Sequence, residues 1–218
     1  MLFIIPIILA YLIGAIPFGL IIARLAGIKD IRQHGSGNIG ATNVWRLAGF
    51  KVALWVFVGD IGKGVIAVLM ARYYLANYQI EFLSADLFLV ICAVVAILGH
   101  VFPIYLGFKG GKGVNTALGT MLTLLPYETL LSFAVFVLVL MIFKYVSLGS
   151  ILAAFTMLIA VLVEKYLMSQ TIAPIYIILC ALLALLIVIT HRSNISRLLS
   201  GTENRFSLKS KLNKGAAS

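Results

Sequence analysis

The chain has 218 residues, of which 62% are hydrophobic and 11% are charged; this excludes a soluble globular protein, whose surface needs about 25% charged residues. Its formal net charge of +10 comes from lysines and arginines that fall between hydrophobic runs, so the charge does not indicate a nucleic-acid partner. Both cysteines, Cys92 and Cys180, lie inside apolar runs without a CxxC spacing, and we expect no disulfide, no metal site and no cofactor.

Six stretches are apolar enough, and long or nearly long enough, to cross a bilayer as helices of about 20 residues. In chain order they are residues 2–23, 52–71, 87–106, 129–143, 146–163 and 172–190. The first lacks the basic start of a secretory signal and is longer than the apolar core of one, so we expect it to be retained. Residues 114–126 are also uncharged, but at about 1.5 Å per residue they are short for a core of about 30 Å. They form either a short, tilted seventh helix or a re-entrant helix.

The basic residues favour the seventh crossing, because short cytoplasmic loops collect lysine and arginine. With an outer, periplasmic N-terminus and seven crossings, all of the 17 lysines and arginines are cytoplasmic except Lys63, Arg72 and Lys165. The sequence thus predicts an all-α, polytopic membrane protein with seven transmembrane helices and a cytoplasmic C-terminus. Residues 1–203 are predicted to form one transmembrane domain, followed by a basic, disordered cytoplasmic tail at 204–218.

Three polar segments interrupt the apolar runs, and all three fall on the predicted cytoplasmic side. The first, residues 35–46, has a GxGxxG spacing, but no strand precedes it and a dinucleotide site is not expected. Glycines still allow backbone N–H groups to converge on an oxyanion, and Arg46 adds a planar donor suited to phosphate. The binding candidates here are Gly35, Ser36, Gly37, Asn38, Gly40, Thr42, Asn43 and Arg46. The alternative is a flexible loop rich in Gly, Asn and Ser.

The second polar segment, residues 99–116, is superficially similar to a P-loop. Gly107 is one position too close to Lys112, and Gly113 stands where Ser or Thr would follow the lysine, so ATP is not expected. Glycines packed around two lysines at the start of a helix still predict an anion site, whereas a tight turn needs fewer glycines. The candidates are Lys109, Gly110, Gly111, Lys112, Gly113 and Asn115, and His100 is interpreted as a packed, structural side chain.

The third polar segment, residues 191–203, directly follows the last span. In a helix, His191 and Asn194 share one face, which places a titratable ring beside an amide. Two further candidates for substrate binding lie in the spans. Lys63 is three residues from Asp60, with which it can pair on one helix face, and Ser147 follows Lys144 at the start of its span.

Together, the three segments resemble the cytoplasmic signatures of the bacterial acyl-phosphate:glycerol-3-phosphate acyltransferases, in order and in spacing. The resemblance implies a seven-helix inner-membrane enzyme with its active site on the cytoplasmic face. Such an enzyme transfers an acyl group from acyl phosphate to the sn-1 hydroxyl of glycerol 3-phosphate and releases lysophosphatidate and phosphate. Neither acyl-CoA nor acyl carrier protein is then the direct donor. The expected partners are these two substrates, the lipid bilayer and the enzymes that supply acyl phosphate.

The resemblance also implies roles for particular residues. Ser36 and Arg46 are needed for activity, residues 110–113 bind glycerol phosphate, His191 and Asn194 belong to the active site, and Glu203 is structural. The expected catalytic set is Ser36, Arg46, Lys112, His191 and Asn194.

The residues themselves argue against an acyl-enzyme intermediate. There is no convincing Ser-His-Asp set, and Tyr105 stands where an H-x-x-x-x-D pair beginning at His100 would need its aspartate. Because acyl phosphate is already activated, we predict direct attack by the substrate hydroxyl, promoted by positioning and charge stabilisation. The proton goes either to His191 or to the substrate phosphate.

The alternative function is a transporter of a phosphorylated solute, which would use Asp60, Lys63 and residues 114–126. A transport path needs polar residues in several spans, whereas the polar residues here gather on one side.

Overall fold

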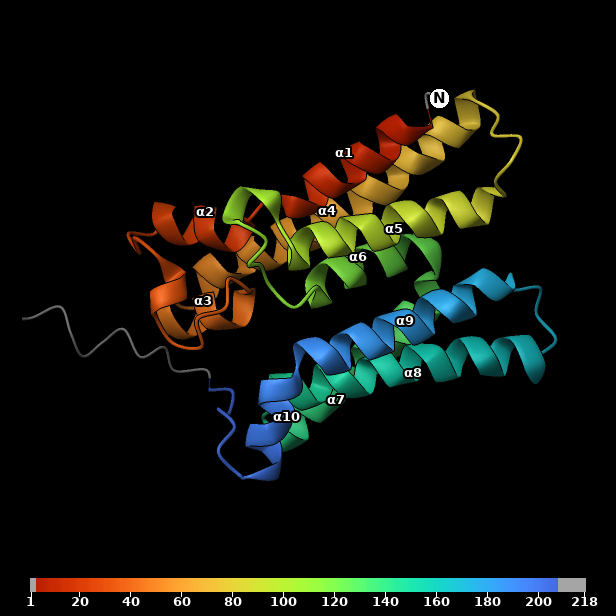
Figure 1. Cartoon of the computed structure of the whole chain (residues 1–218). Coiled ribbons are helices and arrows are strands. Elements are labelled where there is room, and N and C mark those ends of the chain that lie inside the picture. The colour runs from red at the N-terminus through yellow and green to blue at the C-terminus, as the bar shows by residue number, and fades with distance from the viewer. Residues whose placement is uncertain (1–2, 208–218) are drawn as a thin grey trace, which may run out of the picture.

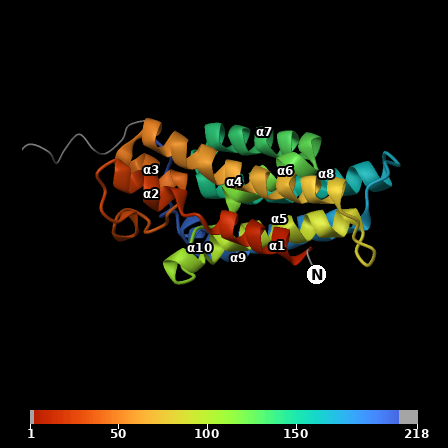
Figure 2. The same cartoon turned by 90° about the horizontal axis from the view of Figure 1, so that it is seen from above.

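The computed structural model describes residues 3–207, and within this range all regular structure is helical. The α-helices are α1 (Ile4–Ala15), α2 (Phe18–Leu25), α3 (Ala41–Ala48), α4 (Phe50–Asn77), α5 (Ala85–Val101), α6 (Val114–Leu124), α7 (Pro126–Phe143), α8 (Val146–Tyr166), α9 (Pro174–Thr190) and α10 (Arg192–Leu199). The turns η1 (Ile31–Gln33) and η2 (Ile104–Leu106) are 3₁₀ helices. The long helices run side by side, and α2, α3 and α10 gather at one end of the bundle (Figure 1; Figure 2).

The structure confirms an all-helical chain rich in apolar spans. Within residues 3–207, five helical stretches are long and apolar enough to cross a membrane, or six if the bent pair α9 and α10 is one span. α6 is apolar but has only 11 residues, which gives about 16 Å at 1.5 Å per residue. Large apolar side chains on α1, α4, α7 and α8 are exposed, as expected of a surface that meets lipid.

Proline explains two differences from the predicted spans. The expected single helix over residues 2–23 is interrupted after Ala15, because Pro17 lacks the N–H needed to continue a helical ladder. The fourth predicted span begins earlier than residue 129, since Pro126 occupies the first turn of α7, where its fixed backbone angle is favourable. Leu125 therefore forms a one-residue break between α6 and α7.

Small residues let the helices that support the site approach closely. A Cβ atom at Gly64 of α4 would lie 2.3 Å from the carbonyl oxygen of Thr116, and one at Gly119 of α6 would lie 2.1 Å from that of Ile61. Such small-residue contacts are typical of helix pairs in membranes. They hold α6 against α4 and fix the position of the segment that precedes α6.

Candidate functional site

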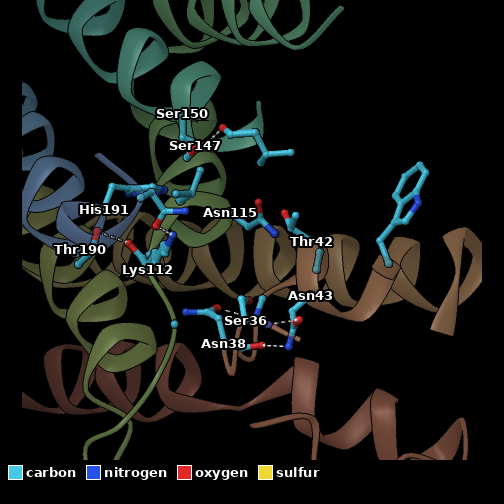
Figure 3. A pocket seen from close by; sticks show the side chains of 18 of the residues that line it. Ser36, Asn38, Thr42, Asn43, Lys112, Asn115, Ser147, Ser150, Thr190 and His191 are labelled. Carbon is cyan, nitrogen blue, oxygen red and sulfur yellow. Dashed lines mark hydrogen bonds between the residues drawn. The ribbon is translucent and has the colours of Figure 1, made fainter. Parts of the chain in front are cut away.

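The three polar segments meet at one cavity of about 990 Å³ at the end of the bundle where α3 and α10 lie. Most of the candidates named from the sequence line it: Gly35, Ser36, Asn38, Gly40, Thr42, Asn43, Arg46, His100, Gly111, Lys112, Gly113, Asn115, Ser147, His191, Asn194 and Glu203. Figure 3 shows Ser36, Asn115, Lys112 and His191 around the same space. Gly37, Lys63, Lys109 and Gly110 are not among the lining residues.

The first polar segment is half loop and half helix, not a flexible loop throughout. Asn43, which is 2% exposed, accepts a hydrogen bond from the backbone N–H of Ser36 (3.0 Å). Its amide nitrogen donates to the carbonyls of His34 (3.0 Å) and Asn38 (2.9 Å). Gly35 is left-handed (φ +61°), and a Cβ there would lie 2.3 Å from Oδ1 of Asn43. Asn43 therefore organises the loop that presents Ser36, and its amide is engaged with backbone.

The same loop leads into α3, which carries Arg46 to the cavity. Asn38 Oδ1 accepts from the N–H of Gly40 (2.8 Å), just before the helix begins at Ala41. Burial lowers the pKa of Arg46, and the nearby Glu203 opposes this shift. A guanidinium has so high an initial pKa that Arg46 remains charged at neutral pH.

Two glycines of the second segment, Gly110 and Gly111, do not offer free N–H groups to an anion. The N–H of Gly110 donates to the carbonyl of Val101, and the N–H of Gly111 donates to that of His100, both at 3.1 Å. A Cβ at Gly110 would lie 2.1 Å from the same carbonyl oxygen of His100. These two N–H groups therefore pin the loop to the end of α5 instead of forming an anion cradle, and the loop directs Lys112 into the cavity.

Lys112 is held by a hydrogen-bonded network that ends at Glu203. The ammonium of Lys112 donates to Oδ1 of Asn194, and Nδ2 of Asn194 donates to Glu203 (2.7 Å). Ser147 (2.9 Å) and Nε of Arg197 (2.7 Å) donate to the same carboxylate. Burial alone would raise the pKa of Glu203, but these hydrogen bonds outweigh it and hold the pKa below its usual value.

Lys112 and His191, which both line the cavity, differ in charge at neutral pH. Burial lowers the pKa of Lys112 to about 8, although Glu203 opposes the shift, so the ammonium form persists at neutral pH. Burial and the charge of Lys112 lower the pKa of His191 to about 4, so its ring is neutral. Nδ1 of His191 lies 2.9 Å from the carbonyl oxygen of Ile187. A carbonyl only accepts, so Nδ1 carries the proton and Nε2 has a free lone pair.

Lys63 forms the expected pair with Asp60, at 2.9 Å between Nζ and Oδ1. Its side chain is buried beneath the cavity and its ammonium also lies 2.8 Å from Nδ1 of His100. The structure thus engages Lys63 in an internal cluster, while Asp60 and His100 border the cavity.

An apolar groove of about 110 Å³ adjoins the polar cavity. It lies between α4, α6, α7, α8 and α9, and shares with the cavity the wall residues Phe57, Val114, Asn115, Phe136 and Ser150. The polar cavity thus continues into an apolar groove between the helices.

Several lining residues were not predicted. The hydroxyl oxygen of Thr190 lies 3.3 Å from the carbonyl oxygen of Lys112, and the ring of Phe206 packs against Trp45 with 4.7 Å between centroids. Arg197 was not among the predicted site residues, although the segment 191–203 contains both Arg197 and its partner Glu203. The contact of Phe206 with Trp45 joins residues far apart in the chain, and no local pattern indicates it.

The chain matches the family model described as Glycerol-3-phosphate acyltransferase over residues 4–201. The glycerol-3-phosphate acyltransferase of Syntrophotalea carbinolica is 45% identical over 206 residues, which cover 94% of this chain and 97% of the relative. Glycerol-3-phosphate acyltransferase 2 of Bacillus anthracis is 43% identical over 202 residues, which cover 93% of this chain and 98% of the relative.

Crystal structures of PlsY (YgiH), described as an integral membrane glycerol 3-phosphate acyltransferase, are similar to this chain. The glycerol 3-phosphate form has a TM-score of 0.82 and 38% identity, and covers 95% of this chain and 96% of that one. The lysophosphatidic acid form has a TM-score of 0.80 and 37% identity, with 95% and 97% covered. The chain therefore belongs to the glycerol-3-phosphate acyltransferase family.

Proposed function

We propose that the chain acylates the sn-1 hydroxyl of glycerol 3-phosphate with acyl phosphate as donor, and releases lysophosphatidate and phosphate. The observation that carries this proposal is the shared wall between a cationic cavity and an apolar groove. A phosphorylated polyol binds in a cationic cavity, and an acyl chain binds in an apolar groove. The relatives and solved structures described above, which are named for glycerol 3-phosphate and lysophosphatidic acid, support the same acceptor and product.

The cations of the cavity suit two phosphates held side by side. Arg46 approaches from α3 and Lys112 from the loop before α6, while Arg192 and Arg197 line the cavity from α10. Guanidinium groups bind phosphate through two parallel hydrogen bonds, and an ammonium adds a compact charge. In our proposal Ser36 and Asn115 add neutral polar groups to the same wall.

The proposed reaction is a direct transfer. The sn-1 oxygen attacks the carbonyl carbon of acyl phosphate, a new C–O bond forms, and the bond from that carbon to the phosphate oxygen breaks. Lys112 and Arg46 stabilise the departing phosphate. With a pKa of about 4, His191 is a weaker base than a phosphate monoester, whose second pKa is about 6. The hydroxyl proton therefore goes to a phosphate oxygen, and His191 stays neutral and positions substrate.

We further propose that the site lies at the cytoplasmic face of a bacterial inner membrane and that α6 makes a short seventh crossing. Support comes from the alternation of helix ends at the cavity. Phe50, Val114 and Val146 line it at the starts of α4, α6 and α8, and Val101 and Ile189 do so at the ends of α5 and α9. This alternation supports a crossing by α6, and the lysines and arginines near the cavity end favour a cytoplasmic location for that end.

The activity is tested with purified protein, radiolabelled acyl phosphate and glycerol 3-phosphate. We expect lysophosphatidate and phosphate in equal amounts when both substrates are present, and no acyl label on the protein when acyl phosphate is supplied alone. Stable labelling of the protein would contradict direct transfer. Uptake of labelled glycerol 3-phosphate into proteoliposomes without acylation would favour the transporter instead.

A further inference from the structure

Asp60, Lys63 and His100 form a buried cluster at the cavity, in which Asp60 and His100 line the cavity and Lys63 does not. The three residues are 1%, 2% and 5% exposed. The Lys63 ammonium contacts Asp60 Oδ1 (2.9 Å) and His100 Nδ1 (2.8 Å), and donates to the carbonyl of Ile16 (2.9 Å) beside the break between α1 and α2. Buried charges that persist in a membrane protein are paired and mark functional regions.

These contacts indicate which nitrogen of His100 carries the proton. The Asp60 carboxylate keeps Lys63 in its ammonium form, and an ammonium donates hydrogen bonds but has no lone pair with which to accept one. Nδ1 of His100 lies 2.8 Å from the Lys63 ammonium and 3.5 Å from Oδ1 of Asp60, so we infer from the shorter contact that Nδ1 accepts from Lys63. In a neutral imidazole the proton then lies on Nε2.

The Nε2 edge of this ring faces the loop that carries Lys112. A Cβ at Gly111 would lie 2.1 Å from Nε2, so the ring edge occupies space that only glycine leaves open. His100, Gly111 and Lys112 all line the cavity. Among the residues that the structure describes, none forms a hydrogen bond with Nε2, although the side chain is almost fully buried.

We propose that His100 is a substrate-binding residue whose Nε2–H donates a hydrogen bond to a phosphate oxygen, with Lys63 and Asp60 as the residues that fix its tautomer. The proposal rests on the function proposed above. An uncharged N–H donor against Gly111, the residue before Lys112, suits an anionic oxygen, and the pair of Lys63 and Asp60 carries no net charge. The phosphate belongs either to glycerol 3-phosphate or to acyl phosphate, and the kinetics below distinguish the two.

Two variants test the two ring nitrogens of His100 separately. In His100→Asn, the side-chain oxygen keeps an acceptor near the Nδ1 position for Lys63 but removes the donor at the cavity. In His100→Gln, the amide nitrogen places a donor near the Nε2 position. We expect His100→Asn to raise KM for one phosphate substrate by about 10- to 100-fold, and His100→Gln to recover part of this loss. The substrate whose KM rises identifies the bound phosphate.

The thermal unfolding temperature of each variant shows whether the substitution destabilises the protein. KM values for both substrates that stay at the wild-type level in His100→Asn would overturn the proposal. Equal losses in both variants, together with lower unfolding temperatures, would also overturn it and leave His100 as a packing residue. Failure of the wild-type protein to transfer acyl groups would instead contradict the proposed function.

A second measurement uses the unaltered protein and does not depend on how the variants fold. Nitrogen-15 NMR of histidine-labelled protein in lipid nanodiscs reports the protonated nitrogen of each ring, and a His100→Gln or His100→Asn sample assigns the signal. We expect His100 to be protonated at Nε2 and its Nε2 signal to shift when the phosphate substrate identified by kinetics is added. Protonation at Nδ1, or a signal that neither substrate shifts, would overturn the proposal.

Discussion

Replacing Lys112 with alanine is expected to lower kcat/KM for glycerol 3-phosphate by about 100- to 1,000-fold, the effect of removing one preorganised charge-stabilising donor. Lys112 is the cation that the pinned glycine loop directs into the cavity, where Asn194 holds its ammonium. The measurement is steady-state kinetics at saturating acyl phosphate. Lys109→Ala is the matched control, because Lys109 is an exposed lysine three residues away that does not line the cavity. Equal effects of the two substitutions would remove Lys112 from the site.

The pH dependence of kcat/KM tests the role of Lys112 independently. Because burial lowers the pKa of Lys112 to about 8, its ammonium loses the proton as the pH rises through 8, and phosphate binding weakens there. We expect kcat/KM of the wild type to fall above pH 8. In Lys112→Arg the side chain stays charged at this pH, so the fall should be much smaller. An identical alkaline fall in both proteins would assign the titration to another group.

Replacing Glu203 with alanine is expected to lower both stability and activity. The carboxylate accepts from Asn194, Ser147 and Arg197, and its removal leaves three donors without their acceptor. Arg197 is partly exposed and can be solvated, so we expect a loss of about 2–3 kcal/mol in the free energy of unfolding. The measurement is thermal unfolding in detergent, together with kcat, which falls because Asn194 no longer holds Lys112 in place.

Glu203→Gln is the matched variant. It keeps an oxygen for Asn194 and Ser147 and loses the charge opposite Arg197, so we expect an intermediate unfolding temperature and partial activity. Wild-type stability and activity in Glu203→Ala would show that the network does not position Lys112.

The sequence was sufficient to predict that three polar segments meet, because phosphate chemistry restricts the residue types. Ser36, Lys112 and His191 belong to three separate segments rich in glycine, amides and cations, and the structure brings the three segments to one cavity. The helical class followed equally directly from the apolar runs. Charge placement predicted that the three segments lie on one side of the membrane, and the structure brings them to one end of the bundle.

The roles of individual residues were harder to predict. Asn43 looked like a ligand for substrate, but its amide is engaged by backbone groups of its own loop. Gly110 and Gly111 suggested free N–H groups, and only the return of the loop onto α5 shows that the carbonyls of His100 and Val101 engage them. Such pairings depend on long-range geometry, which residue type and spacing do not encode. Pro17 indicates a break between α1 and α2, but the long apolar run around it favoured the prediction of a single helix.

Accessibility mapping tests most directly whether one cytoplasmic pocket binds the substrate. Single cysteines at Thr42, Asn115 and Ser193 sample the three cavity-lining segments, and one at Ser84, which caps the start of α5 in the turn after α4, samples the other end of the bundle. A membrane-impermeant thiol reagent should label the first three only in inside-out vesicles, more slowly with glycerol 3-phosphate present, and should label Ser84→Cys only from the opposite side. Labelling of the three cavity positions from different sides, or no protection by glycerol 3-phosphate, would contradict the account.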